Sequence, residues 1–75
     1  MKFEQLSQDE QSIINYFALM EIIFSKSDIL EALDCLDEDL KTLEADKAKP
    51  QEVIDYMKKW SKEKREEVNK GDYYD

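Results

Sequence analysis

The sequence predicts an all-α protein: a small bundle of three helices, or four if the middle one is split, with the first helix at its centre. Glycine and proline occur once each in 75 residues, which leaves little material for the tight turns that join strands. Leu, Glu, Lys, Asp and Ile are the common residues, and most of these favour helix. Apolar residues also recur at spacings of three and four, the period of a helix with a buried face.

The length predicts a single helical domain, residues 1–70, followed by a flexible acidic tail, residues 71–75. A domain this short buries only about 60% of the surface that its unfolded chain exposes, so its own core is marginal. We therefore expect low stability or added stabilisation from a partner.

The first helix is predicted from Gln8 to about Phe24. Ser7 and Glu10 have the spacing of a capping box, in which a hydroxyl and a carboxylate each accept a hydrogen bond from a backbone N–H. In the segment 14–24, INYFALMEIIF, nine of eleven residues are apolar or aromatic. Such a helix is expected to be covered on more than one side.

At 100° per residue, the apolar side chains of the first helix fall on two opposite sides. One side holds Ile13, Phe17, Met20 and Phe24. The other holds Tyr16, Leu19, Ile22 and Ile23. We expect the first side to pack on the other two helices, and the second side to form a subunit or partner interface. The alternative is that all these residues are core.

A second helix is predicted from residue 28 to about residue 47, with cap residues in the segment 25–28, SKSD. An apolar stripe runs along it at spacings of 4, 3, 4 and 3, formed by Ile29, Leu33, Leu36, Leu40 and Leu43. In the alternative division, the segment DCLD interrupts the helix and Asp37 caps a separate one.

A third helix is predicted from about Pro50, which suits a first turn, to Asn69, with Gly71 as the stop. Its apolar residues are confined to the first half, and they are Val53, Ile54, Tyr56, Met57 and Trp60. After Trp60 the chain is polar except for Val68. The second half is therefore expected to project into solvent or to meet a partner.

The net charge of -8 disfavours direct binding to nucleic acid or to an anionic membrane surface. The N-terminus lacks the apolar run of a signal peptide, and no apolar stretch approaches the roughly 20 residues of a membrane span. Cys35 is the only cysteine, which fits a reducing compartment. We expect a cytoplasmic protein without membrane contact.

The composition argues against an enzyme. Histidine, the commonest general base, is absent. Cys35 stands among acids, whereas activated thiols sit beside basic groups. The segment DCLDED lacks the glycine that a calcium-binding loop requires, and zinc would need histidine or several cysteines. We expect no catalytic residue, no metal and no cofactor.

The segment 27–47, SDILEALDCLDEDLKTLEADK, resembles a helix-turn-helix unit, with a turn at Asp34 and Cys35 and a second helix from Asp37. The resemblance implies a DNA-binding regulator. The helix that would read DNA, however, presents Asp37, Glu38, Asp39 and Glu44. Phosphate groups would repel these acids, so the regulator ranks third among the functions considered.

Three acids, Glu31, Asp34 and Glu38, lie on the side of the second helix opposite its apolar stripe. We expect them to engage a basic patch on a partner protein, with imitation of DNA as one version of this hypothesis. The alternative is an ordinary solvated face. The acidic second helix and the basic third helix would then simply complement each other within the chain.

The function expected from these features is a non-enzymatic protein-binding module: an inhibitor or adaptor of phage or mobile-element type that docks on a larger bacterial protein. The alternative is a structural or regulatory subunit that associates with itself, with a homodimer as the commonest outcome.

Overall fold

The computed structural model describes residues 1–71, which form three α-helices and one short 3-10 helix. Their order is η1 (Phe3–Gln5), α1 (Gln8–Ile23), α2 (Lys26–Ala45) and α3 (Gln51–Lys70). No β-strand occurs in this part of the chain, so the prediction of an all-α fold with three helices is confirmed. Except for Gly71, the predicted flexible tail lies outside the described residues.

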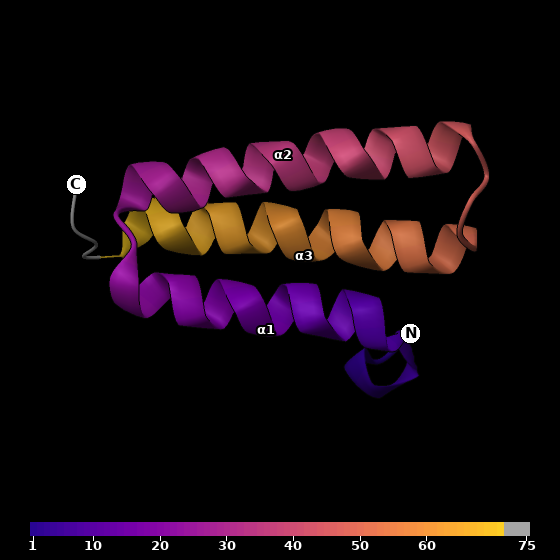
Figure 1. The fold of residues 1–75 in the computed structure, drawn as a ribbon, viewed down its shortest axis with the longest axis horizontal. Coiled ribbons are helices and arrows are strands. Elements are labelled where there is room, and N and C mark those ends of the chain that lie inside the picture. The colour runs from indigo at the N-terminus through magenta and orange to yellow at the C-terminus, as the bar shows by residue number, and fades with distance from the viewer. Residues whose placement is uncertain (72–75) are drawn as a thin grey trace.

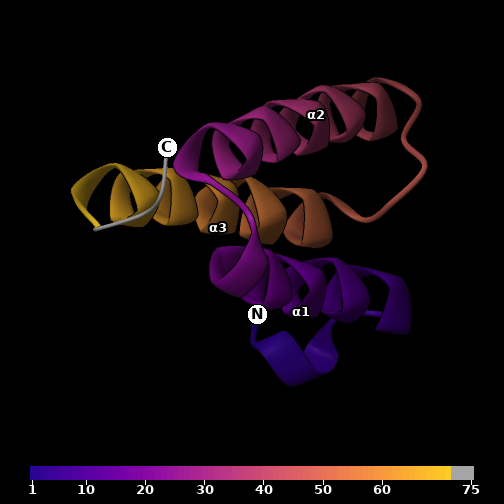
Figure 2. The ribbon, with the colours of Figure 1, turned by 60° about the vertical axis from the view of Figure 1, so that its left-hand side comes forward.

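The helix at the centre of the arrangement is α3. Figures 1 and 2 both place α3 between α2 and α1, with α2 and α3 running antiparallel side by side. The closest backbone approach is between α2 and α3, whereas α1 lies at the edge. The expectation that the first helix is central does not hold, because the apolar stripe of α2 packs directly against α3.

The start of α1 agrees with the prediction, but its capping does not. Ser7 is the N-cap residue, yet its hydroxyl accepts no capping hydrogen bond. The side chain of Glu10 enters the interior, where its Oε1 accepts a hydrogen bond from Lys49 Nζ at 2.8 Å. The predicted capping box is therefore wrong. Glu10 lies two turns before Phe17 on the buried side of α1, where an ion pair replaces the backbone partner.

The middle helix α2 is continuous, which excludes the division at DCLD. It begins two residues earlier than predicted, because the Ser25 hydroxyl accepts a hydrogen bond from the Asp28 N–H and so caps the first turn. Four members of its apolar stripe are buried and Leu43 is half-buried.

The turn after α2 has the hydrogen bonds of a Schellman motif. The Ala48 N–H donates to the Leu43 carbonyl at 3.0 Å, and the Lys47 N–H donates to the Glu44 carbonyl at 3.2 Å. Lys47 has a φ of 54°, in the left-handed region that usually holds glycine at this position. This turn returns the chain so that α3 runs back along α2.

The second half of α3 is packed, contrary to the expectation that it projects into solvent. Ser61 and Val68 are buried, and Lys64 and Arg65 are half-buried. Polar residues remain close to the other helices because each finds a partner there. Ser61 Oγ, for example, donates to Asp37 Oδ1 at 2.7 Å. The helix ends at Lys70, with Gly71 as its C-cap.

The contact between α1 and α3 uses long side chains. The rings of Phe17 and Trp60 meet edge to face, with centroids 5.2 Å apart. Glu21 of α1 forms an ion pair with Lys64 of α3, and the Lys64 ammonium lies 6.0 Å from the centre of the Trp60 ring. Such contacts hold α1 on the pair at a greater distance than α2 and α3 keep from each other.

Candidate functional site

The largest group of exposed apolar side chains lies on the side of α1 that faces away from α3. Tyr16, Leu19, Ile22 and Ile23 are 57% to 77% exposed, and we call these four residues the outer face of α1. Ile13 and Phe24, predicted for the buried side, lie at its edges and are each a little over one-third exposed. Only Phe17 and Met20 among the apolar residues of α1 are buried.

The outer face carries no charged residue. Between residues 11 and 25 the sequence has one charge, that of Glu21. Glu21 lies on the opposite side of the helix, paired with Lys64. In a chain of which 40% is charged, an uncharged strip of exposed apolar side chains is unusual. Depletion of charge and enrichment in large apolar residues are features of the centre of protein interfaces.

The predicted acidic face of α2 is exposed but partly neutralised. Asp34 Oδ1 lies 2.9 Å from Arg65 Nη1, and Asp37 Oδ2 lies 2.8 Å from Arg65 Nη2. Glu38 forms an exposed ion pair with Lys41 at 3.4 Å. Of the three predicted residues, Glu31 alone has no ion pair within residues 1–71. The row of carboxylates therefore has a guanidinium at its middle.

Ion pairs between α2 and α3 show that the two helices complement each other in charge, as the alternative hypothesis held. Glu44 of α2 accepts hydrogen bonds from Lys58 Nζ and from Gln51 Nε2 of α3, each at 2.7 Å. These bonds, that from Lys58 above all, hold the pKa of Glu44 below its ordinary value. Part of the acidity of α2 is thus used inside the chain.

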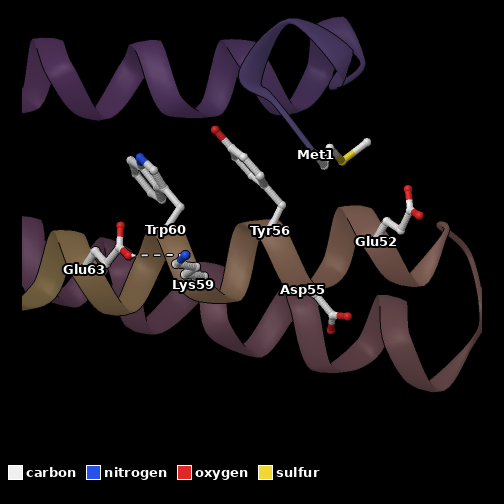
Figure 3. Close-up of a pocket in the computed structure, with 7 residues that line it drawn as sticks. All are labelled: Met1, Glu52, Asp55, Tyr56, Lys59, Trp60 and Glu63. Carbon is white, nitrogen blue, oxygen red and sulfur yellow. Dashed lines mark ion pairs between the residues drawn. The ribbon is translucent and has the colours of Figure 1, made fainter.

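A broad hollow of about 470 Å³ lies along α3. Figure 3 shows Tyr56 and Trp60 rising from α3 toward the N-terminal segment, with Met1 beside Tyr56. Its polar groups are already engaged, since Lys59 Nζ lies 4.0 Å from Glu63 Oε1 and Asp55 accepts a hydrogen bond from Gln51. Trp60 is occupied by its ring contact with Phe17. The hollow therefore offers a ligand few free groups.

A metal-binding or membrane-spanning arrangement was also sought. Across residues 1–71, no three Cys, Asp or Glu side chains converge as metal ligands would. In the same range, the helices fall short of the length and hydropathy that a membrane crossing requires. Cys35 is exposed and unoxidised.

Two interior groups escaped the sequence analysis. Glu10 was assigned to a cap, although its separation of seven residues from Phe17 could have placed it on the buried side of α1. Arg65 is the only arginine, and its two carboxylate partners lie 28 and 31 positions away. Pairing over such distances leaves no periodic signal in the sequence.

Comparisons with protein families, with curated proteins and with solved structures returned no match for this chain. Its function must therefore be inferred from its own surfaces.

Proposed function

We propose that this protein is a small, non-enzymatic protein-binding module that docks through the outer face of α1. The observation that carries the proposal is the exposure of Tyr16, Leu19, Ile22 and Ile23 on one uncharged strip. Covering such side chains with another apolar surface removes them from water, at about 25 cal/mol for each Å² of apolar area. The absence of histidine from the sequence supports the non-enzymatic part of the proposal.

The spacing of the exposed residues favours insertion of α1 into a groove on the partner. Leu19, Ile22 and Ile23 stand at positions i, i+3 and i+4, and Tyr16 precedes Ile23 by seven residues. This is the pattern of anchors by which an amphipathic helix binds a hydrophobic groove. In this arrangement α2 and α3 hold α1 in helical form before binding, which reduces the entropy lost on association.

Charge and size favour a larger, basic partner over a second copy of the chain. A stable interface buries about 800 Å² on each side, which is about 15% of this chain's accessible surface of 5382 Å². Four side chains supply only part of that area, so a partner must also reach the flanks of α1. Two copies with a charge of -8 each would repel one another there, whereas basic residues around a groove would be attracted.

The acidic face of α2 then serves to steer the partner. Glu31 and Glu38 are exposed and lie outside the fork of Arg65. Exposed charges of this kind raise the rate of association more than they add to affinity. Imitation of DNA is the weaker version of the hypothesis, because Arg65 neutralises the central carboxylate, Asp34. An inhibitor or adaptor is the role that fits these surfaces.

The proposal is tested by photo-crosslinking from the surface of the protein in lysate of its host cell. A benzophenone amino acid at position 22 is expected to yield a discrete adduct. The same group at position 62, on an exposed residue of α3, is the matched control and is expected to yield none. Equal labelling from both positions would refute docking through α1.

Affinity for the captured protein provides the quantitative test. Leu19→Ala combined with Ile22→Ala should weaken binding at least tenfold in calorimetry, because both side chains would be central anchors. Glu31→Gln combined with Glu38→Gln should mainly slow association. Sedimentation of the purified chain should show a monomer of 8.9 kDa at high micromolar concentration. A dimer that Ile22→Glu dissociates would replace this proposal with self-association.

A further inference from the structure

A second cavity lies where the N-terminal half of α1 meets the C-terminal half of α2 and the start of α3, at the right-hand end of Figure 1. It has a volume of about 170 Å³ and is separate from the outer face of α1 and from the hollow in Figure 3. Its apolar walls include Leu36, Leu40, Val53 and Met57, all of them buried. Cavities of about 150 Å³ with aliphatic walls admit a molecule of the size of benzene.

One wall of this cavity carries a carboxylate with a free acceptor. The side chain of Glu10 is 5% exposed, and its Oε1 accepts the hydrogen bond from Lys49 Nζ. Its Oε2 is buried and has no hydrogen-bond partner among residues 1–71. An unsatisfied buried acceptor costs about 1–3 kcal/mol, and more when it is charged, so a donor in the cavity would be stabilised there.

The charges around the cavity favour a cation. Its lining includes three carboxylates, those of Asp9, Glu10 and Asp39, but only one ammonium, that of Lys49. Asp9 and Asp39 are exposed and carry their charges toward solvent. Apolar walls suit an organic cation, and the described residues converge on no set of three metal-ligating side chains.

From these observations we propose that the cavity binds an organic ammonium group on an apolar body of about benzene size, with the ammonium donating to Glu10 Oε2. The walls of Leu36, Leu40, Val53 and Met57 enclose the apolar part. Lys49 stays on Oε1 and keeps the carboxylate in place. The ligand is either a free amine or the side chain of a lysine presented by another protein, since both offer the same ammonium on an alkyl stem.

The test is an NMR titration of the ¹⁵N-labelled full chain with three probes of matched shape: benzylammonium, benzyl alcohol and toluene. Benzylammonium should bind saturably and shift the amide signals of Glu10, Leu40 and Val53. Its affinity should exceed that of toluene at least tenfold, with the neutral donor benzyl alcohol between them. Equal affinity for benzylammonium and toluene, or shifts spread evenly over exposed acids, would overturn the proposal.

Variants separate the cavity from general attraction to an acidic protein. Glu10→Gln should lower the affinity for benzylammonium at least tenfold. Glu52→Gln, which removes an exposed carboxylate outside the cavity, should change it less than twofold. If Glu10→Gln does not fold, Leu43→Trp fills the cavity from its half-buried edge and should abolish binding. Unchanged binding by Leu43→Trp would also overturn the proposal.

The source of the ammonium is assigned by a competing titration with a lysine blocked at both backbone ends. Displacement of benzylammonium at comparable concentration assigns the site to a protein side chain. Binding of benzylammonium without such displacement assigns it to a free amine.

Discussion

The pair formed by α2 and α3 and the single helix α1 use similar residues in opposite ways. Ile54 of α3 and Ile29 of α2 are completely buried, whereas Ile22 of α1 is 77% exposed. Ion pairs cross between α2 and α3, and the ion pairs of α1 also point inward, to Lys49 and Lys64. The pair is therefore satisfied within the chain, while α1 keeps one apolar side that the chain leaves uncovered.

This difference shows where stability and recognition are located. Burial in the α2–α3 pair supplies most of the free energy of folding available to so small a domain. The outer face of α1 contributes little to folding, because its side chains stay largely in water. The same apolar area remains available for binding.

The largest expected effect compares the same substitution in the two regions. Ile54→Ala should lower the free energy of unfolding by about 3 kcal/mol, because it opens a cavity between α2 and α3. Ile22→Ala should lower it by less than about 0.5 kcal/mol, because exposed side chains contribute little. Urea denaturation followed by circular dichroism measures both. Similar losses would show that α1 is covered as well as the pair is.

A smaller effect is expected from the ion pairs that join α2 to α3. Arg65→Met should cost about 1 kcal/mol, since its partners Asp34 and Asp37 are partly screened by water. A double-mutant cycle with Asp37→Asn isolates the pair and should give a coupling of at least about 0.5 kcal/mol. Lys41→Met, at the exposed pair with Glu38, is the control and should cost less than about 0.3 kcal/mol. No coupling in the cycle would reduce the fork to a surface contact.

The turn that closes the α2–α3 pair is expected to respond in the stabilising direction. Lys47→Gly should raise the free energy of unfolding by about 0.5–1 kcal/mol, because glycine adopts a φ of 54° without the steric cost that lysine has there. The same change at Lys41, inside α2, should lower it by about 1 kcal/mol. Thermal denaturation distinguishes the two signs, and a loss at position 47 would contradict the left-handed turn.

The smallest effect concerns acid. Because the folded-state pKa of Glu44 lies below its unfolded value, its hydrogen bonds stabilise the fold above about pH 4.5, and this stabilisation is lost as the pH falls through the folded-state pKa. Glu44→Gln should therefore lose less stability on acidification than the natural chain. In a Lys58→Met background, Glu44→Gln should make less difference to the pH dependence, because the first cause of the lowered pKa is gone. Urea midpoints between pH 6 and pH 3 test both.

Local rules predicted the helices well and the partners poorly. Ser25 and Pro50 mark the starts of α2 and α3, and the spacing from Ile29 to Leu43 predicted an apolar side that is buried. The same rules assigned Glu10 to a cap and the second half of α3 to solvent. Both errors arose because the true partners, Lys49 for Glu10 and Asp37 for Arg65, lie dozens of residues away.

The amino-acid pattern alone was sufficient to establish three helices, their approximate ends and the two apolar sides of α1, because these follow from propensity, capping and a period of 3.6 residues. Which helix lies in the middle, which apolar side of α1 stays in water, and which carboxylate is buried with a free oxygen depended on the packing of all three helices. Those outcomes are set by competition among distant contacts, in which α2 and α3 complement each other in charge and shape more closely than either complements α1.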